Sequence, residues 1–260
     1  MRAIEGRADP AVVSLPPDPV IVTGAPRTGV RLLASLLDAH PALASGPDLP
    51  ILTTMVQQWR QIDGELGANH ERHYGVTRAA SREAFRAAAL KLFAPRLERA
   101  GKRRFVVHSF TAAVLLDSFA ALFPDARFVL MTRDAVDIAR SLMRCHWRDA
   151  RGEPLPYTRD AAAAARAAAQ FTAVAALATP PLAAAGRLMF LAYEALCTDP
   201  ADAMARLGDF LGEAPPAPRV RAASARLVAR SPDNPHPPLR VGPVDSASLS
   251  RPRDPGNSAT

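Results

Sequence analysis

The sequence predicts an α/β protein, a three-layer sandwich in which a central parallel sheet is flanked by helices. Two observations predict it. Short apolar runs alternate with amphipathic segments of helical period, which is the pattern of successive βαβ units. The runs are apolar at consecutive positions, as is typical of strands that are covered on both faces. With 260 residues, of which 48% are apolar, the chain is long enough for one such domain with its own core.

The first half of the chain starts with a proline-rich lead-in over residues 1–18. The apolar run 20–23 is expected to be a strand, and 28–39 a helix with its leucines on one face. A proline and a turn over 45–50 end that helix, and we expect another helix at 51–60. Residues 61–80 are polar and lack a period, so we expect a loop. A helix at 81–99, a strand at 103–109 and a helix at 111–122 follow.

The second half repeats the alternation. We expect a strand at 126–134, a helix at 135–147, a polar loop at 148–158 and an alanine-rich helix at 160–178. A fourth strand at 186–196 and two helices at 200–211 and 220–230 complete an α/β domain that spans residues 19–230. Residues 231–260 are rich in proline and are expected to form an extended tail.

The composition argues against several classes of protein. Only Cys145 and Cys197 are present, so neither a disulfide framework nor a zinc cluster is indicated, and a reducing cytoplasmic setting is the simplest interpretation. No signal peptide and no apolar stretch of membrane-spanning length is evident. The net charge of +7 suits an anionic ligand. Because it comes mostly from arginine without interleaved aromatic residues, we expect neither nucleic acid nor a membrane as partner.

The segment GAPRTGVR at 24–31 has the outline of a P-loop-like phosphate site. A strand, a turn with two glycines and a helix N-terminus direct backbone N–H groups and the positive end of the helix dipole at one point. Arg27 adds a fork of donors for phosphate or sulfate oxygens. Val30 and Arg31 stand where an ATP-binding loop has Lys and Ser or Thr, so we expect binding without a metal ion. An ordinary βα turn with a surface arginine is the alternative.

A second candidate site follows the third strand, in the segment RFVLMTRDAVDIARSLMR at 127–144. It places Arg133 at a strand end and Ser141 one to two turns into the next helix. In parallel sheets, ligands bind at the carboxyl ends of the strands. An arginine and a hydroxyl at that edge suit a second phosphate, while a surface turn and a solvated serine are the alternative.

Together the two segments resemble the sulfotransferases that use 3′-phosphoadenosine 5′-phosphosulfate (PAPS). PRTGVRLL at 26–33 is similar to the 5′-phosphosulfate loop of that family, and Arg133 with Ser141 is similar to its 3′-phosphate motif. LLDAHPALASGPDLP at 36–50 resembles the branch with tyrosylprotein and glycan sulfotransferases, here in a short chain of bacterial type. The likeness covers most of residues 20–212 in the family's order.

The resemblance implies a role for several residues. Asp48 would be the catalytic base, which takes the proton of an acceptor hydroxyl as that oxygen attacks sulfur in line with the departing oxygen. A helix cap is the alternative for Asp48. Arg27 would act both in catalysis and in binding, and the tail would cover the cofactor. The implied cofactor-binding residues are Arg27, Thr28, Gly29, Val30 and Arg31 for the 5′-phosphosulfate, Arg133 and Ser141 for the 3′-phosphate, and Tyr193 beside the adenine.

The sequence departs from the family pattern at three places. Val30 and Arg31 replace two hydroxyl residues. His108 stands where the family has a catalytic lysine, and it can stabilise the leaving oxygen only when protonated. Pro243 stands where a basic residue is usual.

Two hypotheses therefore remain. One is a metal-independent transfer of the sulfuryl group from PAPS to a hydroxyl of a small-molecule acceptor. The other is a protein that binds PAPS or its product PAP (3′-phosphoadenosine 5′-phosphate) without transfer. The acceptor pocket is expected in segments 51–80 and 148–165, with aromatic residues that either line it or pack in the core: Trp59, Tyr74, Trp147 and Tyr157.

Overall fold

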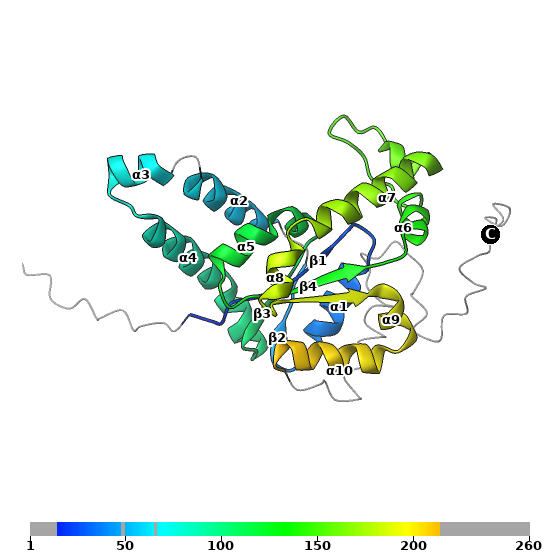
Figure 1. The fold of residues 1–260 in the computed structure, drawn as a ribbon. Coiled ribbons are helices and arrows are strands. Elements are labelled where there is room, and N and C mark those ends of the chain that lie inside the picture. Colours follow the sequence, from blue (N-terminus) through cyan, green and yellow to red (C-terminus); the bar gives the residue numbers. More distant parts are fainter. Residues whose placement is uncertain (1–14, 48–49, 65–66, 214–260) are drawn as a thin grey trace, which may run out of the picture.

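The computed structural model describes residues 15–47, 50–64 and 67–213. Most of the lead-in, Asp48, the expected helix at 220–230 and the tail lie outside these ranges. Within them a five-stranded parallel sheet has the order β2-β3-β1-β4-β5. Helices cover both of its faces (Figure 1), which confirms the predicted fold class. The strands are β1 (Val20–Gly24), β2 (Leu43–Ala44), β3 (Arg104–His108), β4 (Arg127–Thr132) and β5 (Leu188–Ala192).

Each face of the sheet has its own core, because successive side chains of a strand point to opposite faces. Ile21 belongs to one cluster, while Val20 and Val22 belong to the other. Burial of a side chain such as Phe119, which is fully buried, contributes about 1.5–3 kcal/mol. The first face packs on α2 (Ile51–Asp63), α4 (Arg78–Ala100), η1 (Phe110–Leu115), α5 (Leu116–Leu122) and α8 (Thr179–Ala184). The second packs on α1 (Val30–Asp38), α9 (Tyr193–Thr198) and α10 (Pro200–Leu211).

A third, smaller cluster lies beside the loop that follows β1. It joins Ala25 to α6 (Ala135–Leu142) and α7 (Ala161–Ala176). Between these helices the chain forms an antiparallel bridge from Arg148 to Pro154 and the short η2 (Pro156–Thr158). The cluster holds α6 close to the end of β1, and so fixes the distance between the two candidate phosphate-binding segments.

Several predicted boundaries are wrong. The expected loop 61–80 contains α3 (Gly67–Tyr74) and the first turn of α4. Of the residues of α3 only Gly67 is buried, so the segment has no apolar face from which to predict a helix. The strand β2, just before the turn expected at 45–50, was not predicted, and its two residues form a strand because they pair with β3. The helix predicted at 135–147 ends at Leu142, and the strand predicted at 186–196 ends at Ala192.

The carboxyl ends of the strands meet at one edge of the sheet. In register, Val22 pairs with His108, Gly24 with Met131, and Thr132 with Ala192. The loop after β1, the end of β3 and the start of α6 and α9 therefore share this edge, as the sequence predicts. None of the helices in the described part of the chain combines the length and the hydropathy that crossing a bilayer requires.

Candidate active site

The loop between β1 and α1 is shaped by two glycines that admit no side chain. A Cβ on Gly24 would lie 2.4 Å from the carbonyl oxygen of Met131, and one on Gly29 would lie 2.6 Å from Cδ2 of Tyr193. Arg27 between them has a φ of 75°. This left-handed conformation costs a non-glycine residue about 1–3 kcal/mol, so the surrounding contacts must hold it.

The side chains of this loop divide between the core and the edge of the sheet. The Thr28 hydroxyl is buried and donates to the carbonyl of Ala25 at 2.7 Å, and Val30 is packed in the core. Arg31 is exposed. Gly29 is the N-cap of α1 and makes no side-chain hydrogen bond there. The first helical hydrogen bond runs from the Leu33 N–H to the carbonyl oxygen of Gly29 at 3.0 Å. The N–H groups before Leu33 are therefore the donors that a helix start offers to an anion.

Direct hydrogen bonds join this loop to the second candidate segment. Arg27 donates from Nε to Oγ of Ser141 at 2.9 Å. Arg133 donates from Nη1 to the carbonyl oxygen of Arg27 at 3.0 Å. The Arg133 Nε is buried and has no hydrogen-bond acceptor among the described residues. A buried N–H without an acceptor costs about 1–3 kcal/mol, so an anion that reaches Arg133 would find a donor to satisfy.

The electrostatics of this edge favour a strongly anionic ligand. Burial is the main cause that lowers the pKa of Arg27. The next largest effect, that of Cys145, raises the pKa, and the charges of Arg133 and Arg31 each lower it by less. Since arginine keeps its charge at neutral pH, the three guanidinium groups repel one another until an anion lies among them.

The third strand end carries His108, which is buried. Its Nδ1 lies 3.3 Å from Oγ of Ser45, and that Oγ lies 3.4 Å from the carbonyl oxygen of Val106. A protonated His108 can donate to Ser45 while the Ser45 hydroxyl donates to Val106, so this arrangement accommodates an imidazolium ion. The backbone of Ser45 is fixed as well, since its N–H donates to Asp38 at 2.7 Å and its carbonyl accepts from Arg96. Asp48 follows this anchored point.

The sequence also matches a known family of proteins. The sequence model of the protein family described as "Sulfotransferase family" matches residues 19–216 of this chain. The chain belongs to the sulfotransferase family, a family of enzymes. Curated relatives include protein-tyrosine sulfotransferase 1 of Danio rerio, which is 31% identical over 122 residues, or 44% of this chain and 32% of the relative. Protein-tyrosine sulfotransferase A of Caenorhabditis elegans is 28% identical over 131 residues, or 48% of this chain and 32% of the relative. The chain thus spans about a third of the length of these relatives.

Solved structures share the fold of this sulfotransferase family member. The sulfotransferase domain from the curacin biosynthetic pathway matches with a TM-score of 0.52 and 22% identity, over 80% of this chain and 77% of that domain. The sulfotransferase domain of the Synechococcus PCC 7002 olefin synthase matches with a TM-score of 0.53 and 21% identity, over 85% of this chain and 80% of that domain. At this identity the likeness concerns the fold.

Tyr193 makes packing contacts that the amino-acid sequence alone does not predict. The side chain is buried, its ring packs against Gly29, and the guanidinium carbon of Arg133 lies 4.1 Å above the ring centre. Burial is the main cause that raises the pKa of the phenol, and the hydrogen bond with Cys197 acts in the same direction. The Tyr193 ring therefore packs against both the start of α1 and the Arg133 guanidinium, and it positions the two relative to each other. Its contact with an adenine stays a prediction.

Most of the aromatic residues considered for an acceptor pocket pack in the protein. Trp59 is buried in the core of the first face. Trp147 and Tyr157 pack edge to face with ring centres 6.4 Å apart, against the cluster of α6 and α7. Tyr74 is 75% exposed at the end of α3. In the described ranges no group of three or more His, Cys, Asp or Glu gathers as a metal site requires, and binding without a metal stays a prediction.

Proposed function

We propose that this protein transfers a sulfuryl group from PAPS to a hydroxyl of a small molecule. The observation that carries the proposal is the network of Arg27, Ser141 and Arg133, which joins two anion-binding segments at one edge of the sheet. PAPS carries one anionic group at each end of its ribose, and the two segments suit these two groups. The family match over residues 19–216 supports the same donor.

The chain's own residues divide the work of binding the donor. Arg27, the N–H groups at the start of α1 and exposed Arg31 would hold the 5′-phosphosulfate. Arg133 and Ser141 would hold the 3′-phosphate, and Arg133 brings a buried Nε for which the described residues supply no acceptor. Tyr193 keeps the Arg133 guanidinium in place from below. The groups proposed to hydrogen-bond these phosphate and sulfate oxygens are arginine side chains and backbone N–H groups, which bind such oxygens without a metal ion.

The bound donor supplies the sulfuryl group, whose sulfur bonds to the acceptor oxygen as its bond to the 5′-phosphate oxygen breaks and PAP leaves with that electron pair. Asp48 would accept the proton of the acceptor hydroxyl. Arg27 and a protonated His108 would stabilise the negative charge that develops on the leaving oxygen. The Ser45 hydroxyl keeps the His108 ring oriented from the Nδ1 side.

A second candidate function is binding of PAPS or PAP without transfer. The specific observation in its favour is the loop itself, because the Thr28 hydroxyl is turned toward Ala25 and Val30 has none. The sulfuryl group would then meet arginine and backbone N–H groups without a hydroxyl from these positions. We favour transfer, since Arg27, Asp48, Arg133 and Ser141 are all present. The two cysteines, both free and buried, suit a reducing compartment such as the cytoplasm.

The experiment that tests the proposal is sulfuryl transfer from PAPS to a panel of hydroxyl compounds, detected by mass spectrometry, with a chelator present throughout. We expect sulfated product, and PAP binding by calorimetry without added metal. PAP binding with no product from any acceptor would support the binding protein. Arg133→Ala should weaken PAP binding about 10- to 100-fold, as expected for the loss of charged hydrogen bonds. Arg206→Ala, in a surface pair on α10, is the matched control.

A further inference from the structure

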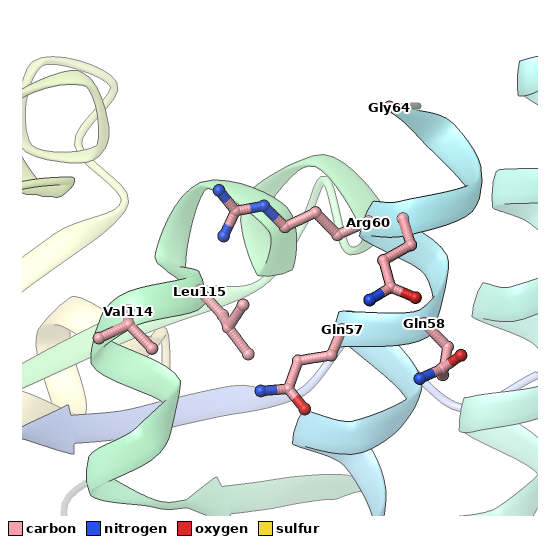
Figure 2. A pocket seen from close by; sticks show the side chains of 7 residues that line it. Gln57, Gln58, Arg60, Gly64, Val114 and Leu115 are labelled. Carbon is pink, nitrogen blue, oxygen red and sulfur yellow. The ribbon is translucent and has the colours of Figure 1, made fainter. Parts of the chain in front are cut away.

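A cavity lies between α2 and η1. It encloses about 690 Å³, which is within the usual range of about 300–1,000 Å³ for small-molecule sites. Figure 2 shows its two sides, with α2 carrying the long polar side chains and η1 facing them. The lining residues are Gln57, Gln58, Arg60, Gln61 and Gly64 at α2, and Val114 and Leu115 on η1.

The two walls of this cavity differ in chemistry. The α2 wall presents three glutamine amides and the guanidinium of Arg60, which extends from its helix on the side of Val114 and Leu115 (Figure 2). Over residues 15–47, 50–64 and 67–213 no hydrogen bond or ion pair engages the Arg60 side chain. The η1 wall is apolar, and Val114 is 51% exposed there. One wall therefore suits a carboxylate or similar anion, and the other suits hydrocarbon.

Both walls start at the edge of the sheet where the donor site lies. η1 begins at Phe110, just after His108, and Val114 lies roughly 8 Å further along a 3₁₀ segment. α2 begins at Ile51, after the loop whose Ser45 contacts His108. Gln57 lies roughly 9 Å further along an α-helix. The η1 wall of the cavity thus lies roughly 8 Å from the start of the segment that follows His108, by the rise of a 3₁₀ helix.

We propose that this cavity is the acceptor site and that it takes an aliphatic hydroxy acid long enough for its carboxylate to lie in the cavity while its hydroxyl reaches past the start of η1, a span of roughly 8 Å or more by the rise of η1. The carboxylate pairs with Arg60 and accepts from the glutamine amides. The hydrocarbon lies on Val114 and Leu115, and the hydroxyl reaches the donor site beside His108. The inference rests on the proposed function, because it names the acceptor class of that same reaction.

The test uses 10-hydroxydecanoate and 1-decanol, which differ only in the carboxylate, with PAPS and the full-length chain. We expect kcat/KM of the hydroxy acid to exceed that of the alcohol by about tenfold or more, as a charged hydrogen bond supplies. Arg60→Gln should remove this preference, and Arg60→Lys should keep part of it. Arg99→Gln, an exposed position near the end of α4, should keep all of it. Equal kcat/KM for the two compounds, or a preference retained in Arg60→Gln, would overturn the assignment.

A binding measurement separates this inference from the proposed function. Decanoate should bind to the wild type without PAPS, and its affinity should fall about tenfold in Arg60→Gln. Binding that depends on Arg60, together with an absence of sulfated product from every compound, would refute transfer and leave the carboxylate site in place. Equal decanoate affinity of the wild type and Arg60→Gln, at unchanged Tm, would refute the site even if other alcohols are sulfated.

Discussion

Arg27 donates from its Nε to Oγ of Ser141 at 2.9 Å, across 114 positions of sequence. This bond joins the loop after β1 to the last turn of α6. The return contact, from Arg133 to the carbonyl oxygen of Arg27, holds the left-handed backbone of that residue. The two candidate anion-binding segments are therefore joined directly, and we expect a change in one of them to alter the other.

The first prediction concerns this coupling. Arg27→Lys and Ser141→Ala should each weaken PAP binding, because each removes a donor to the ligand and the bond between the segments. Since that bond is lost in either single variant, the double variant should lose less than the sum, by about 0.5–3 kcal/mol. Calorimetric titration of PAP into the four proteins measures the cycle. Losses that add within about 0.5 kcal/mol would show the two segments to be independent.

The second prediction concerns Tyr193, which packs against Gly29 and under Arg133. Tyr193→Phe keeps the ring and should retain nearly all PAP affinity. Tyr193→Leu removes the ring below the guanidinium and should lower the affinity about 3- to 30-fold, in line with cation–π energies of about 0.5–2 kcal/mol. The KM for PAPS should rise more than kcat falls, because a positioning residue acts on donor binding. Equal PAP affinity of the two variants would show that the Tyr193 ring does not position Arg133.

The sequence was sufficient to predict the fold class, because each strand except β2 contains an apolar run long enough to recognise. It was insufficient for β2 and α3, and the physical reasons differ. Leu43 and Ala44 are extended only because β3 supplies their partners. The helix α3 has no buried face beyond Gly67, so its sequence carries no period. α10 was predicted with its boundaries, since Asp199 caps it, Pro200 starts it and Gly212 ends it.

The site shows the same division between local and long-range information. Arg27, Arg133 and Ser141 were predicted as binding residues from short motifs, each within a strand, turn and helix. The packing of Tyr193 against Gly29 joins two distant elements, and no local pattern encodes it. The cavity beside Arg60 was expected only as part of segment 51–80. The polar and apolar walls of this cavity come from α2 and η1, and only the three-dimensional fold brings these two segments together.

The third prediction concerns Asp48, which lies outside the described residues. As the general base, it should be required for turnover and not for donor binding. Asp48→Asn should lower kcat by about 10²–10⁴-fold, as for other general bases, and leave the Kd of PAP unchanged. Product formation with PAPS and calorimetry with PAP measure the two effects. A variant with wild-type turnover and a lower Tm would make Asp48 a helix cap.

The fourth prediction concerns the charge of His108. If a protonated His108 stabilises the leaving oxygen, kcat/KM of the wild type should fall as the pH rises and the imidazole loses its proton. His108→Lys carries a charge that persists through neutral pH, so its profile should be flat there. The Ser45 hydroxyl lies 3.3 Å from Nδ1 of His108 and can accept a hydrogen bond from the protonated ring. Flat profiles for both proteins would exclude His108 from the chemistry.

The fifth prediction concerns the stability of the fold in alkaline solution. Burial is the main cause that raises the pKa of both thiols, Cys145 and Cys197. The folded protein therefore holds these protons more tightly than the unfolded chain does. Their contribution is fully present below the unfolded pKa of about 8.5, and it is lost as the pH rises above that value.

We accordingly expect Tm to fall between pH 8 and 9.5, where unfolded thiols ionise. Each thiol can add at most about 1.4 kcal/mol of stability loss per pH unit. The double variant Cys145→Ala with Cys197→Ala should give a flatter curve than the wild type over this interval, whatever its stability at pH 7. Thermal unfolding at matched ionic strength measures both curves. Parallel curves would show that the thiols titrate alike in the folded and unfolded protein, against the effect expected from their burial.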